Sequence, residues 1–358
     1  MRLTDLGWSP YFQSHFQQEE PEGCVPARVS GESKGFYRVL AEEGEFLAQI
    51  AGRIRYRAED RDDLPAVGDW VVVVPRPAES RATILAILPR RTILSRKEAG
   101  RTAEEQILAT NLETVFVVTS LNQEFNLRRI ERYLAVVWGS GAQPVVLLSK
   151  ADLCPDVDVV RARVERVVPG APVHSLSAAS GQGLESVRQY LRPGRTAAFI
   201  GSSGVGKSTI INALAGEAML RVRPVRAADD RGRHTTTSRQ LIVLPAGGIV
   251  VDTPGMRELQ LWESSAGLAP AFDDLEALAQ ECRFRDCRHR GEPGCAVAGA
   301  IEDGALSRER LENYRKMEAE LRFLETKTDL RARSAKKVRT KQLMKAQKRF
   351  YKQSKDGQ

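Results

Sequence analysis

The glycine-rich segment GSSGVGKST, Gly201 to Thr209, constrains the fold of this chain more than any other feature. It fits the pattern G-x-x-x-x-G-K-[ST], follows the apolar run RTAAFIG and precedes the helical pattern KSTIINALAG. Glycines let the backbone turn so that its N–H groups point at phosphate oxygens, and the next helix adds a favourable field. In such loops the lysine, here Lys207, neutralises β- and γ-phosphates, and the Ser208 hydroxyl ligates Mg²⁺. The segment therefore predicts a nucleoside triphosphate site, without fixing the base, made by Gly201, Ser202, Ser203, Gly204, Val205, Gly206, Lys207, Ser208 and Thr209.

The flanking residues, 104–261, alternate apolar strands with helical patterns, as a βα-layered domain does. The predicted strands are TVFVVTS, PVVLLS, PVHSLSA and RTAAFIG, and the predicted helices are NLRRIERYLAVVW, DVDVVRARVERVV and GLESVRQYL. At 358 residues and 42% hydrophobic content, the whole chain is long enough for two or three domains, each with its own core.

A second motif indicates which base is bound. The strand PVVLLS leads into the segment Ser149, Lys150, Ala151 and Asp152. A carboxylate at Asp152 can accept hydrogen bonds from guanine N1–H and N2–H₂ together, a pair that adenine does not offer, and the aliphatic stem of Lys150 can cover the ring. Ser177 and Ala178 follow another strand, like the second guanine-contacting loop of GTPases.

The order of these motifs is unusual, because the guanine motifs precede the phosphate loop. Downstream, a strand ends in the segment DTPG, in which we expect Asp252 to organise Mg²⁺ through water and the Gly255 N–H to sense the γ-phosphate. Between them, GRHTTTS offers Thr236 as a magnesium ligand, with Thr235 and Thr237 as close rivals. Since the termini of a compact domain lie near each other, joining them and cutting elsewhere preserves a site, so the order predicts circular permutation.

Three of the five cysteines lie within 14 residues and suggest metal. Cys282, Cys287, His289 and Cys295 form C-x4-C-x-H-x5-C, a tetrahedral set suited to one structural Zn²⁺. The alternative, a chance cluster of reduced cysteines, is disfavoured by four ligand-capable residues so close together.

The N-terminal region predicts a small barrel. Between about Gly23 and Lys97, five β-rich runs alternate with turn signals, namely VPARVS, GFYRVL, EFLAQIAGRIRYR, GDWVVVV and RATILAIL, which fits an OB-like fold. As a single strand, the third run has apolar residues on one face and arginines on the other. The first set is Ile50, Ile54 and Tyr56, and the second is Arg53, Arg55 and Arg57. These arginines either contact nucleic acid or are ordinary solvated positions.

Positive charge is concentrated at the C-terminal end. Eleven residues from Arg331 to Gln358 are Lys or Arg and one is acidic, whereas the other 330 residues carry a net charge of −2. Cations interleaved with Leu343, Met344, Phe350 and Tyr351 favour RNA over an acidic membrane surface or a purely solubilising helix. Because no apolar run or leader is long enough for a membrane, we expect a cytoplasmic protein without membrane association.

Taken together, these motifs resemble the ribosome small-subunit-dependent GTPase A family. The resemblance runs from about Gly23 to the basic tail and departs from the usual N-K-x-D motif at Ser149, which stands in place of Asn. It implies a circularly permuted GTPase that binds the small ribosomal subunit and its rRNA, acts late in subunit assembly and hydrolyses GTP faster on the ribosome. We expect a monomer with five parts, namely an extension (1–23), an OB-like barrel (24–98), a permuted α/β GTPase domain (104–261), a mainly helical zinc domain (262–330) and a basic tail (331–358).

The catalytic group is predicted less directly. Many GTPases orient the attacking water with a Gln after D-x-x-G, but here that residue is Met256. His234, beside the threonines, is the candidate for this role, as the resemblance also implies; a contact role is the alternative. Two other functions share most motifs, namely a P-loop ATPase or kinase and a nucleotide-gated RNA-binding protein with negligible turnover. Nucleotide preference separates the first from a GTPase, and turnover separates the second.

Overall fold

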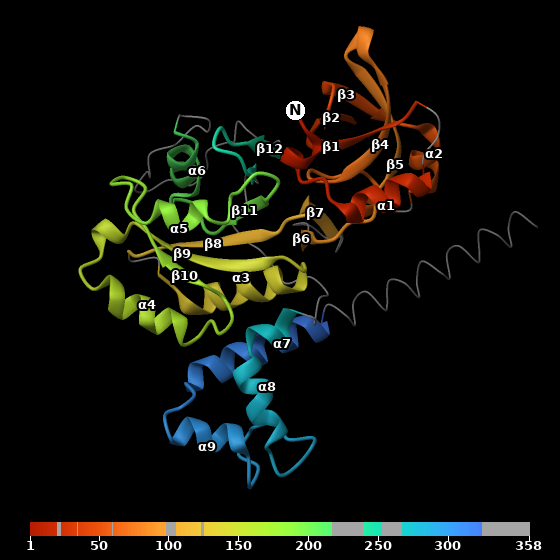
Figure 1. Cartoon of the computed structure of the whole chain (residues 1–358). Coiled ribbons are helices and arrows are strands. Elements are labelled where there is room, and N and C mark those ends of the chain that lie inside the picture. Colours follow the sequence, from red (N-terminus) through yellow and green to blue (C-terminus); the bar gives the residue numbers. More distant parts are fainter. Residues whose placement is uncertain are drawn as a thin grey trace, which may run out of the picture.

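The computed structural model describes residues 1–19, 23–33, 35–58, 60–97, 105–122, 125–216, 239–252 and 267–323. Figure 1 shows three parts, which are a β-rich N-terminal part, a central sheet with helices on its faces, and a helical C-terminal part. Among the helices of these described ranges, none combines the length and the apolar character needed to span a membrane.

The N-terminal part is a closed five-stranded barrel. Its strands are β1 (Val25–Ser33), β2 (Phe36–Ala41), β3 (Gly44–Ile50), β4 (Trp70–Arg76) and β5 (Arg81–Ile87). They pair in the order β1-β2-β3-β5-β4, and pairing of β4 with β1 closes the ring. The inward side chains of alternate residues, such as Val29, Val39 and Ile84, are fully buried. The predicted β-barrel is thereby confirmed.

One predicted strand is wrong in its second half. The run expected to extend to Arg57 ends as a strand at Ile50 and continues as helix α2 (Gly52–Arg57). The Ala51 N–H donates to the Ile84 carbonyl, which is the last hydrogen bond between β3 and β5. The guanidinium of Arg53 donates to the carbonyl of Leu85 at 2.9 Å. Beyond Ala51 the backbone bonds to itself, since the Ile54 N–H donates to the Ala51 carbonyl at 3.0 Å and the Ala58 N–H to the Ile54 carbonyl at 2.9 Å. The alternation of two faces expected for this run therefore does not occur.

The segment before the barrel covers its outer side. Helix α1 (Pro10–Glu19) buries Phe12 and Phe16 in a cluster with Leu6 and Trp70. The Trp8 ring meets that of Trp70 edge-on at 4.7 Å between centroids. The extension is thus packed against the barrel.

The central part begins with the hairpin of β6 (Ile93–Lys97) and β7 (Glu105–Thr110). Its main sheet has the order β10-β9-β8-β11-β13-β12. The first five strands of this order are parallel to one another, and β12 is antiparallel to β13. The strands are β8 (Thr114–Ser120), β9 (Gln143–Ser149), β10 (Val173–Ser175), β11 (Thr196–Ile200), β12 (Gln240–Val243) and β13 (Ile249–Asp252). Strand β11 lies at the centre, between β8 from earlier in the chain and β13 from later.

Helices cover both faces of this sheet (Figure 1). They are α3 (Leu127–Gly139), α4 (Val157–Glu165), α5 (Leu184–Arg188) and α6 (Lys207–Ala215). Alternate residues of one strand join different cores, since Ala198 and Ile200 pack with α3 and α4 while Ala197 and Phe199 pack with α5 and α6. This alternation explains why the sequence of β11 is apolar without interruption.

The C-terminal part is helical and rests on α3. It contains α7 (Leu268–Ala271), α8 (Asp273–Gln280), α9 (Ala296–Glu302) and a helix over residues 308–323. Its core of Phe272, Val297 and Met317 includes Ala135 of α3. A Cβ added to Gly267 would lie 1.9 Å from the Ala135 carbonyl oxygen, so glycine is required at this close approach.

A buried ionic network also joins α3 to this part. Arg310 pairs with Glu131 of α3 and with Asp274, to which it donates at 2.7 and 2.8 Å. The amide of Asn313 donates to the other Glu131 oxygen at 2.5 Å. Nearer solvent, Arg132 donates to Glu320 at 2.7 Å. Packing and charge thus fix the C-terminal part on one helix of the central domain.

Candidate nucleotide site and metal centre

The predicted nucleotide-binding segments meet at one edge of the central sheet. Strands β8, β9, β10, β11 and β13 are parallel, so their carboxyl ends lie at the same edge. In open α/β sheets, ligands bind beyond this edge. The phosphate loop follows β11 there, and the segments after β9 and β10 stand beside it.

The phosphate loop has the backbone that its glycines predict. Gly201 has a φ of 143°, and a Cβ there would lie 2.2 Å from the Val118 carbonyl oxygen. Gly204 and Gly206 have φ values of 80° and 95°, and Gly206 is the N-cap of α6. The turn therefore aims the first backbone N–H groups of α6, with Lys207, Ser208 and Thr209, at the space beyond the sheet.

Lys207 is the charged group of this loop. Its Nζ donates to the carbonyl oxygens of Gly201 at 2.8 Å and Ser202 at 2.7 Å. Burial lowers the pKa of Lys207 to about 8, and the nearby carboxylate of Asp252 opposes that shift. Burial raises the pKa of Asp252, whereas Lys207 lowers it. An ammonium and a carboxylate, each partly desolvated, thus face the place where phosphate and a cation would lie.

Ser149 connects the segment predicted to bind guanine to the phosphate loop. Its buried Oγ lies 2.6 Å from the carbonyl oxygen of Val205 and 3.2 Å from that of Thr119, and its single proton goes to the nearer acceptor. Lys150 follows in the left-handed conformation at φ 58°, and Asp152 lies exposed on a short 3-10 helix. The serine that replaces the usual asparagine therefore still ties the two segments together.

The second predicted guanine loop adjoins the first. The Ala151 N–H donates to the Leu176 carbonyl at 3.1 Å, immediately before Ser177 and Ala178. Ser177 is fully buried, and its N–H donates to Gln182 at 2.9 Å, which closes the turn. The structure thus brings Asp152, Ser177 and Ala178 into one region.

Arg129 is a residue that the sequence did not single out. From the first turn of α3, its Nη1 donates to the Ser202 hydroxyl of the phosphate loop at 2.7 Å. Asn126 caps this helix by accepting from the Arg129 N–H at 3.2 Å. Only the sheet order, which places the start of α3 beside the phosphate loop, could have indicated this contact.

Several predicted residues lie outside the described ranges. They are the candidate catalytic His234, the magnesium candidate Thr236 with its rivals Thr235 and Thr237, and Gly255 with the neighbouring Met256. Their roles stay predictions.

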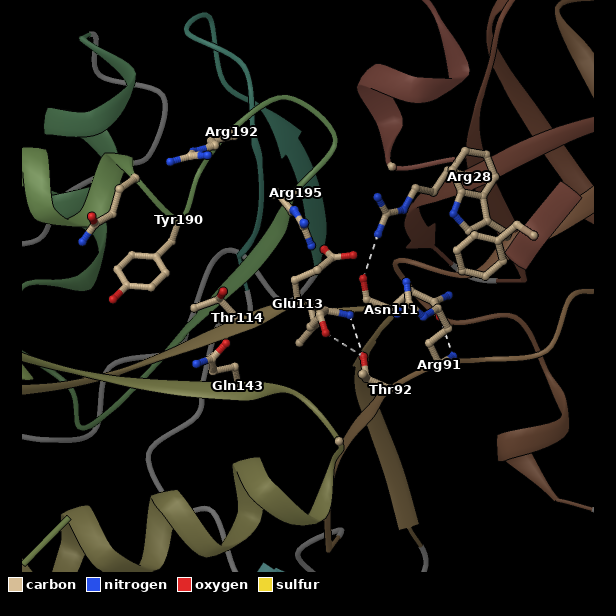
Figure 2. Close-up of a pocket in the computed structure, with 16 residues that line it drawn as sticks. Arg28, Arg91, Thr92, Asn111, Glu113, Thr114, Gln143, Tyr190, Arg192 and Arg195 are labelled. Atoms are coloured by element: carbon tan, nitrogen blue, oxygen red, sulfur yellow. Dashed lines mark hydrogen bonds between the residues drawn. The ribbon is translucent and has the colours of Figure 1, made fainter. Parts of the chain in front are cut away.

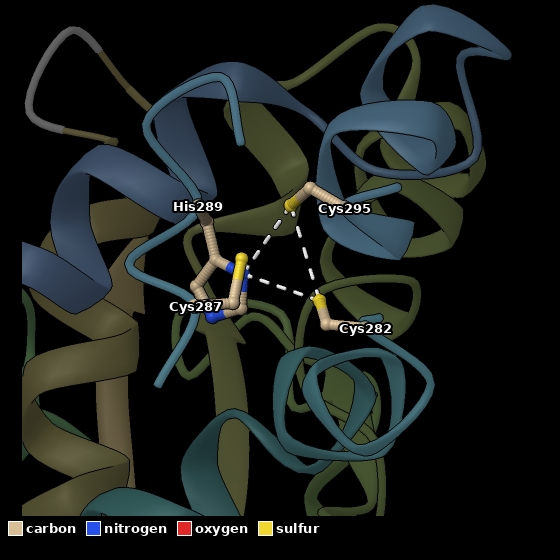
Figure 3. A group of neighbouring side chains, drawn as sticks. All are labelled: Cys282, Cys287, His289 and Cys295. Atoms are coloured by element: carbon tan, nitrogen blue, oxygen red, sulfur yellow. Dashed lines mark hydrogen bonds between the residues drawn. The ribbon is translucent and has the colours of Figure 1, made fainter. Parts of the chain in front are cut away.

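The predicted metal ligands converge in the C-terminal part (Figure 3). The ligand atoms of Cys282, Cys287, His289 and Cys295 all lie within 4.8 Å of one another. His289 Nδ1 is 3.4 Å from Cys295 Sγ and 3.6 Å from Cys282 Sγ, and the last two sulfurs are 3.9 Å apart. The cluster can therefore hold a metal ion.

Side chains hold the backbone around this cluster by hydrogen bonds. Glu292 accepts hydrogen bonds from the N–H groups of Arg288 at 3.1 Å and Arg290 at 2.5 Å. Arg315, on the helix over 308–323, donates to the His289 carbonyl oxygen and to that of Arg288 at 3.2 Å. These contacts hold the ligand loop against the helical core.

Known proteins match this chain over its full length. A family model described as RsgA GTPase matches residues 87–262. A protein of Opitutus terrae named "Small ribosomal subunit biogenesis GTPase RsgA" is 46% identical over 357 residues, which is 97% of each chain. A protein of the same name from Syntrophotalea carbinolica is 42% identical over 100% of both chains.

Solved structures show the same fold. YjeQ from Thermotoga maritima matches with a TM-score of 0.64 and 29% identity, over 83% of this chain and 98% of that one. YloQ, titled a circularly permuted GTPase, matches with a TM-score of 0.61 and 24% identity, over 84% and 96%. Together with the central place of β11, these matches confirm the permuted order of the sheet.

Proposed function

Because this chain belongs to the RsgA GTPase family, we propose that it hydrolyses GTP in the biogenesis of the small ribosomal subunit. One observation carries the proposal, namely the hydrogen bond from Ser149 to the phosphate-loop carbonyl of Val205. It holds the segment suited to guanine at a fixed place relative to the loop suited to phosphates.

Each part of the nucleotide has residues of matching chemistry. Asp152 accepts from the guanine edge, with Lys150, Ala151, Ser177 and Ala178 around the base. The phosphates lie against the loop from Gly201 to Thr209, with charge supplied by Lys207. The family implies Mg²⁺, which screens the phosphate charge; Ser208, Thr236 and Asp252 fit its preference for oxygen ligands, and Gly255 is suited to sense the γ-phosphate.

His234 is proposed to orient the attacking water, since Met256 has no group able to do so. The ribosome would stimulate hydrolysis by bringing His234 toward the γ-phosphate. This role belongs to the transition state, so substrate affinity should depend little on it.

The metal proposed at the cysteine cluster is structural Zn²⁺. With Zn–S near 2.3 Å and Zn–N near 2.0–2.1 Å, a tetrahedron has S···S edges of about 3.8 Å and S···N edges of about 3.6 Å. The separations of Cys282, Cys295 and His289, at 3.9, 3.6 and 3.4 Å, fit such an ion. Four protein ligands leave no open position, so the ion would supply folding free energy.

The proposed partners are the small subunit, its rRNA, and GTP or GDP, and the proposed compartment is the cytoplasm. The charge of residues 331–358 supports RNA as the partner, since each phosphate contact releases counterions. We further propose that the chain acts as a monomer, late in assembly, with domains at 24–98, 104–261 and 262–330 between the extension and the tail.

Single-turnover hydrolysis tests this function. Wild type should hydrolyse GTP but not ATP, and faster with purified small subunits; Asp152→Asn should lose the preference for guanine. His234→Ala should lose most of the stimulated rate while keeping its GTP affinity. Equal wild-type affinity for ATP and GTP would indicate an ATPase or kinase, and no turnover with subunits would indicate a nucleotide-gated binding protein.

A further inference from the structure

A cavity lies at the edge of the central sheet opposite the candidate nucleotide site. It encloses about 500 Å³, within the range of small-molecule sites. Its walls include Phe12 of α1, Trp70 of the barrel, and Thr114 and Gln143 at the amino ends of β8 and β9. Arg192 and Arg195, on the turn before β11, complete it. Figure 2 shows these two arginines on the sheet side of the cavity and Arg28 on the barrel side.

The charge of the lining is strongly positive. Four arginines line the cavity, against one acidic residue, Glu113. Glu113 is already engaged, since its carboxylate accepts from the Thr196 N–H at 2.8 Å. Arg28 is also engaged, because its buried guanidinium donates to backbone carbonyls at Leu6, Gly68 and Asn111. Arg28 therefore adds fixed positive charge without being available to a ligand.

Arg192 and Arg195 are different. Both are exposed, and neither guanidinium has a hydrogen-bond or ion-pair partner within the part of the chain that the structure describes. They stand three residues apart on one turn, which the Arg195 N–H closes by donating to the Arg192 carbonyl at 2.9 Å. Planar guanidinium groups on a fixed turn suit a phosphate, which they can bind bidentately.

A neutral donor also lines the cavity. The Trp70 indole N–H is fully buried and has no acceptor among the described residues. Leaving a buried donor unpaired is unfavourable, so native proteins rarely do so. The exposed side-chain amides of Gln143 and Gln189 add further polar groups to the same lining.

We propose that this cavity binds a phosphate ester, with the phosphate between Arg192 and Arg195 and the body of the ligand toward Trp70. The chemistry fits a nucleoside phosphate, either free or as one unit of a single-stranded RNA. Its place at the amino ends of the strands separates it from the GTP site, and it does not rest on the proposed GTPase function. Strand β11 links the two sites, because it runs from Arg195 to the phosphate loop.

Binding can be followed at Trp70 itself. With the nucleotide site saturated by GDP and Mg²⁺, uridine 5′-monophosphate and a six-residue oligouridylate are titrated into ¹⁵N-labelled protein. The Trp70 indole resonance, assigned by comparison with Trp70→Phe, should shift saturably with at least one probe. A shift with the monophosphate indicates a free nucleotide as the source; a shift with the oligonucleotide alone indicates an RNA strand.

Two variants that lose the same charge distinguish binding at this cavity from non-specific attraction to a positive surface. Arg192→Gln/Arg195→Gln should weaken binding about tenfold or more, since both charge-assisted contacts to the phosphate are lost. Arg163→Gln/Arg166→Gln removes two exposed arginines of the same domain, one in α4 and one at its C-cap, and should change affinity less than twofold. GTP hydrolysis should be unchanged in both. Equal weakening by the two pairs, or no movement of the Trp70 resonance with either probe, would overturn the proposal.

Discussion

Replacing Arg310 with methionine should loosen the attachment of the C-terminal part to α3. Methionine has a similar length and can fill much of the space, but it carries no charge and no donor. Glu131 would keep its bond from Asn313, while its charge would lose its cationic partner in a place where both side chains are 4% exposed. The carbonyl oxygens of Val167 and Ala271 would lose the Arg310 donors that they now accept at 2.9 and 3.0 Å.

The expected magnitude follows from this burial. Removing one partner of a buried ion pair costs about 3–5 kcal/mol, because the remaining charge is left uncompensated. Asp274 adds little to the loss, since its side chain is 34% exposed and can be hydrated. We expect opening of the interface to become more frequent by about two to four orders of magnitude, at 1.4 kcal/mol per factor of ten.

The loss of interface stability in Arg310→Met should also depend on pH. Burial raises the pKa of Glu131, and Arg310 opposes that rise. Without Arg310 the native carboxyl holds its proton to higher pH than the unfolded one, whose pKa is about 4.3. The folded variant then binds more protons, so its stability falls as the pH rises above that value. The difference in stability between wild type and Arg310→Met should therefore be smaller at pH 5 than at pH 8.

Hydrogen exchange resolved by peptide is the suitable assay, because it reports local opening in a chain of several domains. Peptides from α3 and from residues 308–323 should exchange faster in Arg310→Met, with peptides from the barrel as the internal control. Glu131→Gln/Arg310→Met should recover much of the loss, since the amide removes the stranded charge. A loss below about 1 kcal/mol at pH 8, or no recovery in the double variant, would refute this account of the network.

Three further predictions concern the two sites. GTP affinity should fall as the pH rises past about 8, because the Lys207 pKa is lowered to that value and only the ammonium attracts phosphate; a flat titration between pH 7 and 9 would contradict this. Ser149→Ala should weaken GDP binding about two- to tenfold by removing a bond with a net contribution of about 0.5–1.5 kcal/mol, whereas Ser149→Asn should not. Elemental analysis should find one zinc per chain, absent from Cys287→Ser, whose thermal unfolding should begin at a lower temperature.

Much of the fold was predictable because its signals are local. The apolar runs that became β8, β9 and β11 are bounded by turn residues, and the glycines from Gly201 to Gly206 require a backbone that few other residues can adopt. The four candidate metal ligands lie within 14 positions of one another, so their spacing alone indicated a cluster.

The rest depends on partners that are distant in sequence. Glu131 and Arg310 are 179 positions apart, and nothing near either residue indicates the other. Arg129 reaches the phosphate loop across 73 positions. Helix α2 was missed for the same reason, since the end of β3 depends on how far its pairing with β5 extends, and that pairing ends at Ile50 and Ile84. Periodicity describes one segment at a time and cannot supply this information.

The central position of β11 also sets an order of events during synthesis. Strands β8 and β9 leave the ribosome before β11, and β13 leaves last, although β11 must pair with both β8 and β13. At roughly 5–20 residues per second, the end of β11 at Ile200 emerges about 4–16 s after Ser120, the end of β8. During that interval the edge of β8 presents unpaired N–H and C=O groups. A nascent chain with the phosphate-loop strand first would not expose this edge of β8, so the permuted order of strands lengthens the time during which the edge can pair with another chain.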